Sequence, residues 1–365
     1  MKRLLLLVLG TALGDFEAPK FDIDLALAPE DRWKEISTYV IEKHGWEGTY
    51  GPLLAYFEET LGHDFFVTYD SQLQKIIEMM SAEYGSELKG IYSTLTNLGF
   101  ADRITLGEIA MLQLYYELNP YCTGMLVENS EGNMLHGRNM DYSLPGLANI
   151  TVDVSFLDGE SKETIMQSTT FLGYVGVVTG MRNDGWAIQV NQRFKLEIPI
   201  LHTFIAALNG FRSVGLAVRD ELMSTEDFSS AVEKLSKVQL MAPLYLIMSG
   251  LDQGEGAILI GDRDGVDDGS KKRHEGVVHL GDDAEWYLVQ TNHDPWLRHV
   301  SDGREEFAEG ELANLGQDSA TLDTMRTILS TPPSLAKGTI YTTMMSASTN
   351  HFQTTVRTHD EHNEI

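Results

Sequence analysis

The apolar pattern of this chain predicts an α+β fold, in which a helical first third precedes a layered body of strands and helices. Up to Tyr121, apolar residues recur at the spacing of amphipathic helices, and from Cys122 onward they follow the pattern of strands. Strands then return after a helical interval, which is typical of sheets covered by helices. The main structural boundary is therefore predicted between Tyr121 and Cys122.

The first third is predicted to contain four helices. Apolar residues at helical spacing place them at residues 29–44, 52–61, 71–84 and 106–118. The fourth helix has a clear start, because Thr105 is a good N-cap and Glu108 stands three residues later, as in a capping box.

After the boundary, a hairpin is predicted first. Strands at 123–128 and 134–138 flank residues 129–133, whose Asn, Ser and Gly form a turn signal. Further strands are predicted at 150–157, 164–169, 175–179, 186–191, 245–248, 256–260, 276–279, 286–290 and 340–346. Helices are predicted at 202–209, 229–235 and 323–329, and the polar last residues are expected to form a loose tail.

The charge of the chain excludes some classes of partner. Lys and Arg number 27 against 54 Asp and Glu, a formal net charge of -27. Such a chain repels phosphate, so neither nucleic acid nor an anionic membrane is expected to attract it by charge. Acidic pH would relax this repulsion by protonating carboxylates, so the composition suits a lysosome-like compartment.

The N-terminus predicts entry into the secretory route. A basic start, a short apolar core and small residues form a signal-peptide pattern over residues 1–14, which is too short to span a membrane. The mature chain is then expected to begin near Asp15. In this compartment, Asn149 in Asn149-Ile150-Thr151 is a candidate glycosylation site.

Cys122 is the one cysteine of the chain, so no intrachain disulfide can form. A lone cysteine is more often a small buried apolar residue than a nucleophile, and its neighbours must decide between the two. The predicted hairpin brings Cys122 close to Arg138 and Asp141 on the next strand. An arginine favours the reactive thiolate, and an aspartate can orient an amine, although an ordinary ion pair is the alternative reading. We interpret His136, on the face of Arg138, as structural.

Cleavage of the chain would supply the missing base. If the bond between Tyr121 and Cys122 is cut, Cys122 gains a free α-amine, which titrates at about 7.7–8.0 when unperturbed. Such an amine can act as the base of its own nucleophile.

Other motifs are weaker, and neither a metal nor a cofactor is expected. The spacing of His274 and His279 is one residue too long for a zinc helix. The aspartates between residues 262 and 268 resemble a calcium loop, but Val266 stands at a ligand position. The chain has no nucleophile elbow, P-loop or dinucleotide fingerprint.

Several stretches together resemble the acid ceramidase and N-acylethanolamine acid amidase family of N-terminal nucleophile hydrolases. The resemblance covers nearly all of the chain after residue 14, and in detail it is closer to the N-acylethanolamine branch. The stretches are Pro29-Glu30-Asp31-Arg32-Trp33, Tyr116-Glu117, Cys122-Thr123, His136-Gly137-Arg138-Asn139-Met140-Asp141-Tyr142, Thr151-Val152-Asp153-Val154, Gly173-Tyr174-Val175-Gly176, Thr179-Gly180, Thr291-Asn292-His293-Asp294-Pro295-Trp296 and Ile340-Tyr341-Thr342-Thr343-Met344.

The resemblance implies a four-layer αββα fold and self-cleavage at acidic pH between Tyr121 and Cys122. The products would be a helical α-subunit at residues 15–121 and a catalytic β-subunit at 122–365, associated as a heterodimer. Cys122 would be the nucleophile and its α-amine the base. The family also implies lysosomal hydrolysis of fatty-acyl amides.

By position in the same motifs, Arg138 would contact the thiol and the substrate carbonyl, and Asp141 would hold the α-amine. Asn292 would donate to the oxyanion, and Arg304 would support Asp141. Substrate contacts are assigned to Tyr174 and Gln192. Gln192 stands where the family carries an acidic residue before the arginine, so the resemblance does not carry over a carboxylate that triggers cleavage. Ser301-Asp302-Gly303-Arg304 replaces a more charged Asp-Arg-Arg pattern, which makes Arg304 the least secure assignment.

Alternatives remain open at this stage. N-acylethanolamines are the preferred substrates and ceramide is the runner-up. A bile-salt or penicillin-type amidase and a non-catalytic lipid-binding relative are more remote. The stretch at residues 50–66, rich in Leu, Tyr and Phe, is a candidate for peripheral membrane contact, with helix packing as its alternative.

Overall fold

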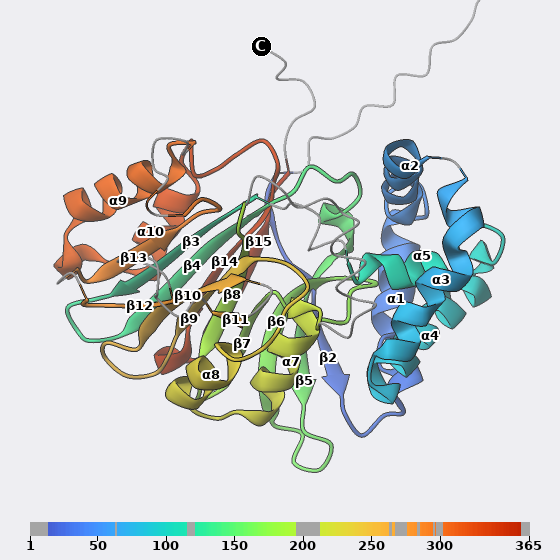
Figure 1. The fold of residues 1–365 in the computed structure, drawn as a ribbon, viewed down its shortest axis with the longest axis horizontal. Helices are drawn as coiled ribbons and strands as arrows, with labels where there is room; N and C mark the ends of the chain where they lie inside the picture. The colour runs from blue at the N-terminus through green and yellow to red at the C-terminus, as the bar shows by residue number, and fades with distance from the viewer. Residues whose placement is uncertain are drawn as a thin grey trace, which may run out of the picture.

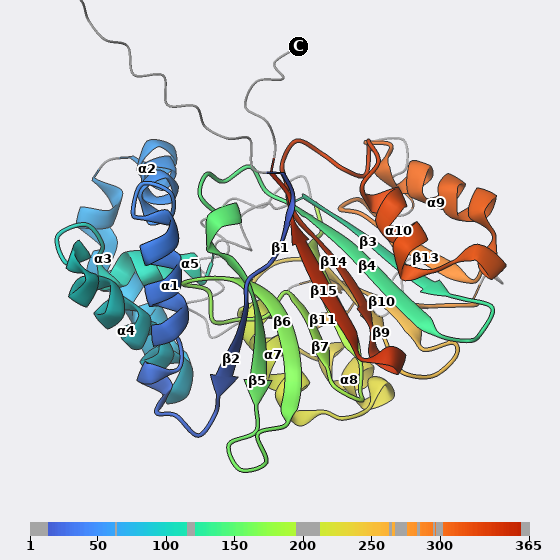
Figure 2. The same ribbon diagram turned by 180° about the vertical axis from the view of Figure 1, so that it is seen from behind.

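Two β-sheets stacked face to face form the body of the protein, and helices cover both outer faces (Figures 1 and 2). The computed structural model describes residues 14–62, 64–114, 121–194, 212–262, 265–266, 276–282, 285–294, 296 and 302–358. The predicted helix at 202–209 and the predicted tail lie outside these residues, as does all but Gly14 of the predicted signal peptide.

The two sheets are mainly antiparallel. The first contains, in spatial order, β1 (Phe16–Glu17), β15 (His351–Val356), β14 (Thr339–Ser346), β4 (Met134–Asp141), β3 (Tyr121–Glu128) and β13 (Tyr287–Gln290). The second contains β11 (Gly265–Val266), β10 (Gly256–Asp262), β9 (Leu244–Ser249), β8 (Ala187–Gln192), β7 (Thr179–Arg182), β6 (Thr164–Phe171), β5 (Thr151–Leu157) and β2 (Lys20–Asp24), while β12 (Val277–His279) also pairs with β10.

The layer order is αββα, as expected. Helices α9 (Arg304–Leu315) and α10 (Leu322–Leu329) cover the first sheet, and α7 (Val214–Ser224) and α8 (Phe228–Leu235) cover the second. A separate helical unit lies beside this sandwich (Figure 1). It contains α1 (Lys34–His44), α2 (Tyr50–Leu61), α3 (Phe65–Met79), α4 (Ala82–Leu95) and α5 (Leu106–Leu112). The predicted capping box of Thr105 and Glu108 is present at the start of α5.

The N-terminal third is mostly helical, as predicted, but it also contains two short strands that were not predicted. Its first residues form β1, which pairs with β15 of the first sheet, and β2, which runs parallel to β5 of the second (Figure 2). Both strands are short and lie at sheet edges, so no strong alternation marks them in the sequence. One short segment therefore ties the helical unit to both sheets.

The single helix predicted at residues 71–84 is wrong, because α3 ends at Met79 and α4 begins at Ala82, with Met80 and Ser81 between them. Ser81 has extended backbone angles, and its hydroxyl accepts a hydrogen bond from the Tyr84 amide, which makes it the N-cap of α4. Apolar residues continue at helical spacing across this break, so periodicity alone did not show it.

The strand predicted at residues 175–179 is also wrong, since β7 only begins at Thr179. The preceding segment leaves the sheet and packs on α7, where the Val177 amide donates to the Gly215 carbonyl at 2.9 Å. A Cβ at Gly176 would lie 2.9 Å from the Gly215 carbonyl carbon, so this approach requires glycine.

The hairpin at the boundary is confirmed and fixes the register of the site. Strands β3 and β4 pair antiparallel with Tyr121 opposite Asp141, Cys122 opposite Met140 and Gly124 opposite Arg138. Residues opposite each other share a face, and neighbours along a strand point to opposite faces. Cys122 and Arg138 therefore face the second sheet, whereas Tyr121 and Asp141 point to the other face.

Candidate active site

The thiol of Cys122 lies buried between the two sheets and is held by Arg138. Arg138 Nη2 donates a hydrogen bond to Cys122 Sγ at 3.0 Å, and both side chains are fully buried. Met140, which follows Arg138 on the same face of β4, places its sulfur 3.9 Å from the thiol. A guanidinium at this distance favours the nucleophilic thiolate.

Arg138 is itself held by residues to which the sequence analysis assigned no role. Its Nη1 donates to the Val178 carbonyl at 3.1 Å and to the hydroxyl of Thr179. Its guanidinium lies 5.5 Å from the ring centre of Tyr341, whose hydroxyl is 2.8 Å from that of Thr179. Thr179 and Tyr341 both lie in stretches that carry the family resemblance, and this was the sequence signal that could have identified them as site residues.

The hairpin pairs Asp141 with Tyr121, next to Cys122 as expected, but its side chain lies on the face of the sheet opposite to the thiol. Its Oδ2 accepts a hydrogen bond from Arg304 Nη1 at 3.0 Å, and its Oδ1 accepts one from the Thr339 hydroxyl at 2.6 Å. Burial raises the pKa of Asp141 to about 6, even though Thr339 and Arg304 favour its charged form. The position of Arg304 beside Asp141 agrees with the expectation.

Asn292 and Arg304 hold the backbone of Cys122. The Cys122 amide donates to Asn292 Oδ1 at 2.8 Å, and the Cys122 carbonyl accepts from Arg304 Nη1 at 3.0 Å. Arg304 Nη2 also donates to Asn292 Oδ1 at 3.0 Å. Because the Cys122 amide and Arg304 both donate to Oδ1, the orientation of the Asn292 side-chain amide is determined. Its Nδ2 then donates to the Gln192 carbonyl at 2.8 Å.

Arg304 reaches this position because α9 begins at it. The preceding Gly303 has a left-handed conformation with φ of 83°, which suits glycine and turns the chain into the helix. Asp302 accepts a hydrogen bond from Arg304 Nε at 2.8 Å. Burial would raise the pKa of Asp302, but the contact with Arg304 holds it below its ordinary value.

Tyr121 lies at the edge of an open cavity. The bond between Tyr121 and Cys122 is intact within β3, and the Tyr121 side chain is 50% exposed. Its ring lies 4.8 Å from that of Phe194 and 5.6 Å from the Arg304 guanidinium. Beside it is a cavity of about 520 Å³, lined by Tyr56, Tyr121, Asp141, Tyr142, Ser143, Asp302, Arg304, Pro333, Ala336 and Gly338. The bond predicted to be cut therefore joins an exposed residue to a buried one.

The structure does not place the side chain of Tyr174 at this site. Tyr174 is buried in the core, and its hydroxyl lies against Gly215 of α7. Gln192 is also buried, and its backbone carbonyl, which any residue would supply, supports Asn292. His136 has partners on both ring nitrogens, Ser249 and Gln189, each at 3.1 Å, and burial lowers its pKa to about 3. A neutral structural histidine fits these contacts.

Asn149, the candidate glycosylation site, is partly buried where the helical unit meets the sandwich. Its Nδ2, the atom that would carry the sugar, donates to the Gly48 carbonyl at 2.8 Å, between the helical unit and the sandwich. Thr151 of the same triplet is buried and donates its hydroxyl to the Leu147 carbonyl. An attached sugar would replace the other hydrogen of Nδ2, so glycosylation at Asn149 stays a prediction.

Within the described residues, no group of three or more His, Cys, Asp or Glu side chains is arranged to hold a metal ion. A search of the same residues finds no helix with the length and apolar character needed to cross a membrane.

Comparison with known proteins places the site in context. The family model described as linear amide C-N hydrolases, choloylglycine hydrolase family, matches residues 122–323, so the match begins at Cys122. Acid ceramidase of Mus musculus is 30% identical over 307 residues, covering 79% of this chain and 73% of the relative. Acid ceramidase of Homo sapiens is 28% identical over 360 residues, covering 93% of this chain and 86% of the relative.

Among solved structures, an N-acylethanolamine-hydrolyzing acid amidase ortholog from Caenorhabditis elegans is similar. It is 30% identical, has a TM-score of 0.54, and covers 62% of this chain and 93% of its own. The predicted resemblance and the predicted fold class are both confirmed by these comparisons.

Proposed function

Because the chain belongs to the choloylglycine hydrolase family of linear amide C-N hydrolases, and so is an amide-hydrolysing enzyme, we propose that it is a self-cleaving amidase acting on N-acylethanolamines. The products would be a fatty acid and ethanolamine. The observation that carries the proposal is the 3.0 Å contact between Arg138 Nη2 and Cys122 Sγ at the first residue of the family match.

In the first stage, Cys122 Sγ attacks the carbonyl carbon of Tyr121. A carbon–sulfur bond forms, the carbon–nitrogen bond breaks, and the Cys122 nitrogen takes up a proton to become an amine. Water then hydrolyses the thioester, which leaves a carboxylate on Tyr121 and restores the thiol. The hydrogen bond from the Cys122 amide to Asn292 supports this stage, because it orients the reacting peptide. Arg304 fixes the next peptide through the Cys122 carbonyl.

In the second stage, the same thiol attacks the amide carbonyl of a lipid. The α-amine of Cys122 accepts the thiol proton and passes it to the leaving ethanolamine, and water later releases the fatty acid. We assign stabilisation of the oxyanion to the Asn292 amide and substrate positioning to Arg138. Asp141 and Arg304 lie on the backbone side of Cys122, where the α-amine would appear after cleavage, so we assign them to that amine.

Incubation at about pH 5 tests the first stage, with the Cys122→Ala variant beside the wild-type protein. We expect two fragments that meet between residues 121 and 122 in the wild type and one intact mass in the variant, by intact-protein mass spectrometry. A wild-type chain that stays whole, or equal cutting of the variant, would remove the α-amine and overturn the mechanism.

Ceramide is the second candidate substrate, because the curated relatives described above are ceramidases. An N-acylethanolamine and a ceramide with the same acyl chain separate the two proposals when kcat/KM is measured for each. A higher value for the N-acylethanolamine is expected, and a reversed order would favour the ceramidase.

We further propose that residues 15–121 and 122–365 remain associated as a heterodimer in a lysosomal compartment, after removal of residues 1–14. The similarity to enzymes named as acid hydrolases supports the acidic setting. Sequencing of the N-termini of protein isolated from cells would show whether the chain starts near Asp15.

Peripheral membrane contact through residues 50–66 has limited support. Most of its apolar side chains, including Leu53, Leu54, Phe57 and Phe66, are buried among the helices, while Tyr56 is exposed. On α3, Val67 and Tyr69 are exposed beside this stretch and extend the apolar surface. We propose at most weak contact, and unchanged vesicle binding by a Val67→Glu variant would argue against it.

A further inference from the structure

A cluster of charges lies buried where α4 of the helical unit meets α7 of the sandwich. Glu87 on α4 is fully buried and accepts hydrogen bonds from both terminal nitrogens of Arg219 on α7, at 2.7 and 2.8 Å. It also accepts one from Arg32 at 3.0 Å and one from Trp33 Nε1 at 2.9 Å. These four bonds use the acceptor capacity of a carboxylate, so the position specifies a charged acid.

Arg219 is enclosed from both sides. Its guanidinium carbon lies 4.4 Å from the ring centre of Tyr84 on α4 and 4.7 Å from that of Phe156 on β5. Its Nη1 also donates to the Val175 carbonyl at 2.8 Å. A planar cation placed between two rings and held by a carboxylate is strongly oriented.

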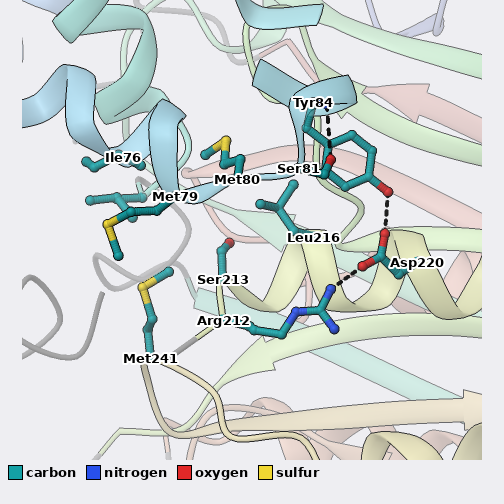
Figure 3. A pocket seen from close by; sticks show the side chains of 11 residues that line it. Ile76, Met79, Met80, Ser81, Tyr84, Arg212, Ser213, Leu216, Asp220 and Met241 are labelled. Carbon is teal, nitrogen blue, oxygen red and sulfur yellow. Dashed lines mark hydrogen bonds and ion pairs between the residues drawn. The ribbon is translucent and has the colours of Figure 1, made fainter. Parts of the chain in front are cut away.

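The cluster continues to the surface along α7. The hydroxyl of Tyr84 donates to Asp220 Oδ1 at 2.5 Å, and Asp220 pairs with Arg212 (Figure 3). Figure 3 shows these residues beside the turn between α3 and α4, where Ser81 caps α4 next to methionine side chains. The polar contacts between α4 and the α7 region therefore extend from the buried Glu87 to the surface at the edge of this interface.

The bond between Tyr121 and Cys122 divides this cluster in two. Arg32, Trp33, Tyr84 and Glu87 precede the bond, and Arg219 follows it. Two other ion pairs of the described residues cross the same boundary, but the carboxyl side chains of Asp24 and Asp15 are 30% and 40% exposed. The side chains of Glu87 and Arg219 are 0% and 2% exposed.

This difference in burial determines which of the three ion pairs contributes most to the association of the two segments. Exposed pairs contribute little to stability because water and salt screen them. Removal of one partner from a buried pair leaves an uncompensated charge away from water, which is strongly destabilising. The Glu87–Arg219 pair is therefore the charged contact on which association of the two segments depends most.

The cluster also keeps its charge at acidic pH. Burial alone would raise the pKa of Glu87, but Arg219 and the hydrogen bonds from Trp33 and Arg32 hold it below its ordinary value of 4.5. A lowered carboxyl pKa means that the stabilisation is present above the ordinary value and is lost only as the pH falls through the lowered one. The pair thus persists at about pH 5, where cleavage is proposed.

We propose that the Glu87 cluster, made of Arg32, Trp33, Tyr84, Glu87 and Arg219, is the charged contact on which the binding of residues 15–121 to residues 122–365 depends most after the chain is cut, beside the pairing of β1 and β2 with the sheets. The inference rests on the proposed self-cleavage, and the partner it fits is the other half of the same chain. Loss of the Glu87 charge should raise the dissociation constant of the two cut segments by roughly 10²–10³-fold.

The test compares Glu87→Gln with the wild type, each with and without Cys122→Ala. Glu47→Gln is the matched control, since Glu47 pairs with Arg103 within the same segment and its side chain is 82% exposed. Mass spectrometry reports cutting, and size-exclusion chromatography at pH 5 in increasing urea reports whether both fragments elute together. Near-ultraviolet circular dichroism reports whether the uncut variants fold.

We expect both fragments of the wild type and of Glu47→Gln to elute together. The cut Glu87→Gln protein should separate at lower urea, while Glu87→Gln with Cys122→Ala should stay folded because the peptide bond tethers the segments. If the cut Glu87→Gln fragments still elute together up to the urea concentration that the wild type tolerates, the proposed role of the Glu87 cluster is overturned, while self-cleavage stands. If the wild type is not cut at all, the proposed self-cleavage is wrong, and the proposed role of the Glu87 cluster, which rests on it, is wrong as well.

A second variant decides the case in which Glu87→Gln does not fold even when uncut. Arg219→Lys keeps the positive charge beside Glu87 but loses the paired hydrogen bonds and the flat contact with Tyr84 and Phe156. We expect its cut fragments to separate at lower urea than those of the wild type. Separation at the wild-type urea concentration would overturn the proposal.

Discussion

Cys122 joins two sets of polar contacts, one to its side chain and one to its backbone. Its side chain meets Arg138 between the sheets, and its backbone meets Asn292 and Arg304. A nucleophile must be reactive and its target must be oriented, and these are separate requirements. At this residue they are met by separate groups, so substitutions should separate them experimentally.

Replacement of Asn292 should mainly reduce turnover. In Asn292→Leu the oxyanion loses a donor, and we expect kcat to fall by roughly 10²–10³-fold with a smaller change in KM. Steady-state kinetics on an N-acylethanolamine would measure both. Gln72→Ala, an exposed amide on α3, is the control and should retain wild-type rates. A raised KM at unchanged kcat would show instead that Asn292 only binds the substrate.

At the scale of elements, close backbone contacts position the helices around the site. Helix α4 packs on the short helix at Pro29–Asp31, and a Cβ at Gly90 would lie 2.1 Å from the Glu30 carbonyl oxygen. This approach brings Glu87, one turn earlier on α4, to Arg32 and Trp33. Glycine at this position therefore supports the geometry of the charged cluster.

Gly90→Ala should destabilise the chain. The new methyl group must push α4 away from the backbone of Glu30, and we expect a loss of about 1–3 kcal/mol in the free energy of unfolding. Urea unfolding of the Cys122→Ala chain would measure it. Gly310→Ala on α9 is the control, because its Cβ meets nothing within 4 Å and alanine should add about 0.5–1 kcal/mol. Equal effects of the two changes would contradict the packing argument.

For the whole molecule, buried acids between and beside the sheets couple stability to pH. Asp153 on β5 is buried, and its Oδ1 accepts from the Thr169 hydroxyl, which in turn contacts Thr354 on the first sheet. Among the described residues, its Oδ2 has no hydrogen-bond partner, and burial raises the pKa of Asp153 to about 7. Lys20 and Glu17 are the charged groups that act on it from the N-terminal strands.

A raised carboxyl pKa makes the fold most stable at acidic pH. The folded chain binds the Asp153 proton more tightly than the unfolded chain, so stability is lost as pH rises from about 4 towards 7. We expect the Cys122→Ala chain to be more stable at pH 5 than at pH 7.5. Asp153→Asn, which stays neutral, should reduce this difference by up to about 2.5 kcal/mol, because the raised pKa lies about two units above pH 5. Asp22→Asn, at an exposed position, is the control, and an unchanged pH dependence in Asp153→Asn would refute the assignment.

Local sequence features determined much of the fold and part of the candidate site. Helical and strand periodicities, the capping box at Thr105 and the hairpin between β3 and β4 were all readable, because each depends on residues a few positions apart. The pairing of Cys122 with Arg138 followed from the same hairpin. The break at Ser81 and the departure of residues 175–178 from the sheet were missed, since a local pattern gives no sign of them.

Contacts between distant segments required the tertiary structure. The contact of Asp141 with Arg304, the bonds of Asn292 and Arg304 to the backbone of Cys122, the support of Arg138 by Thr179 and Tyr341, and the Glu87–Arg219 pair all join residues far apart in the chain. Periodicity reports which side chains share a face, but the partner of that face depends on how the sheets and helices pack. Residues 122–365 carry the chemistry in their sequence, and the packing of the N-terminal segment against them is visible only in the folded chain.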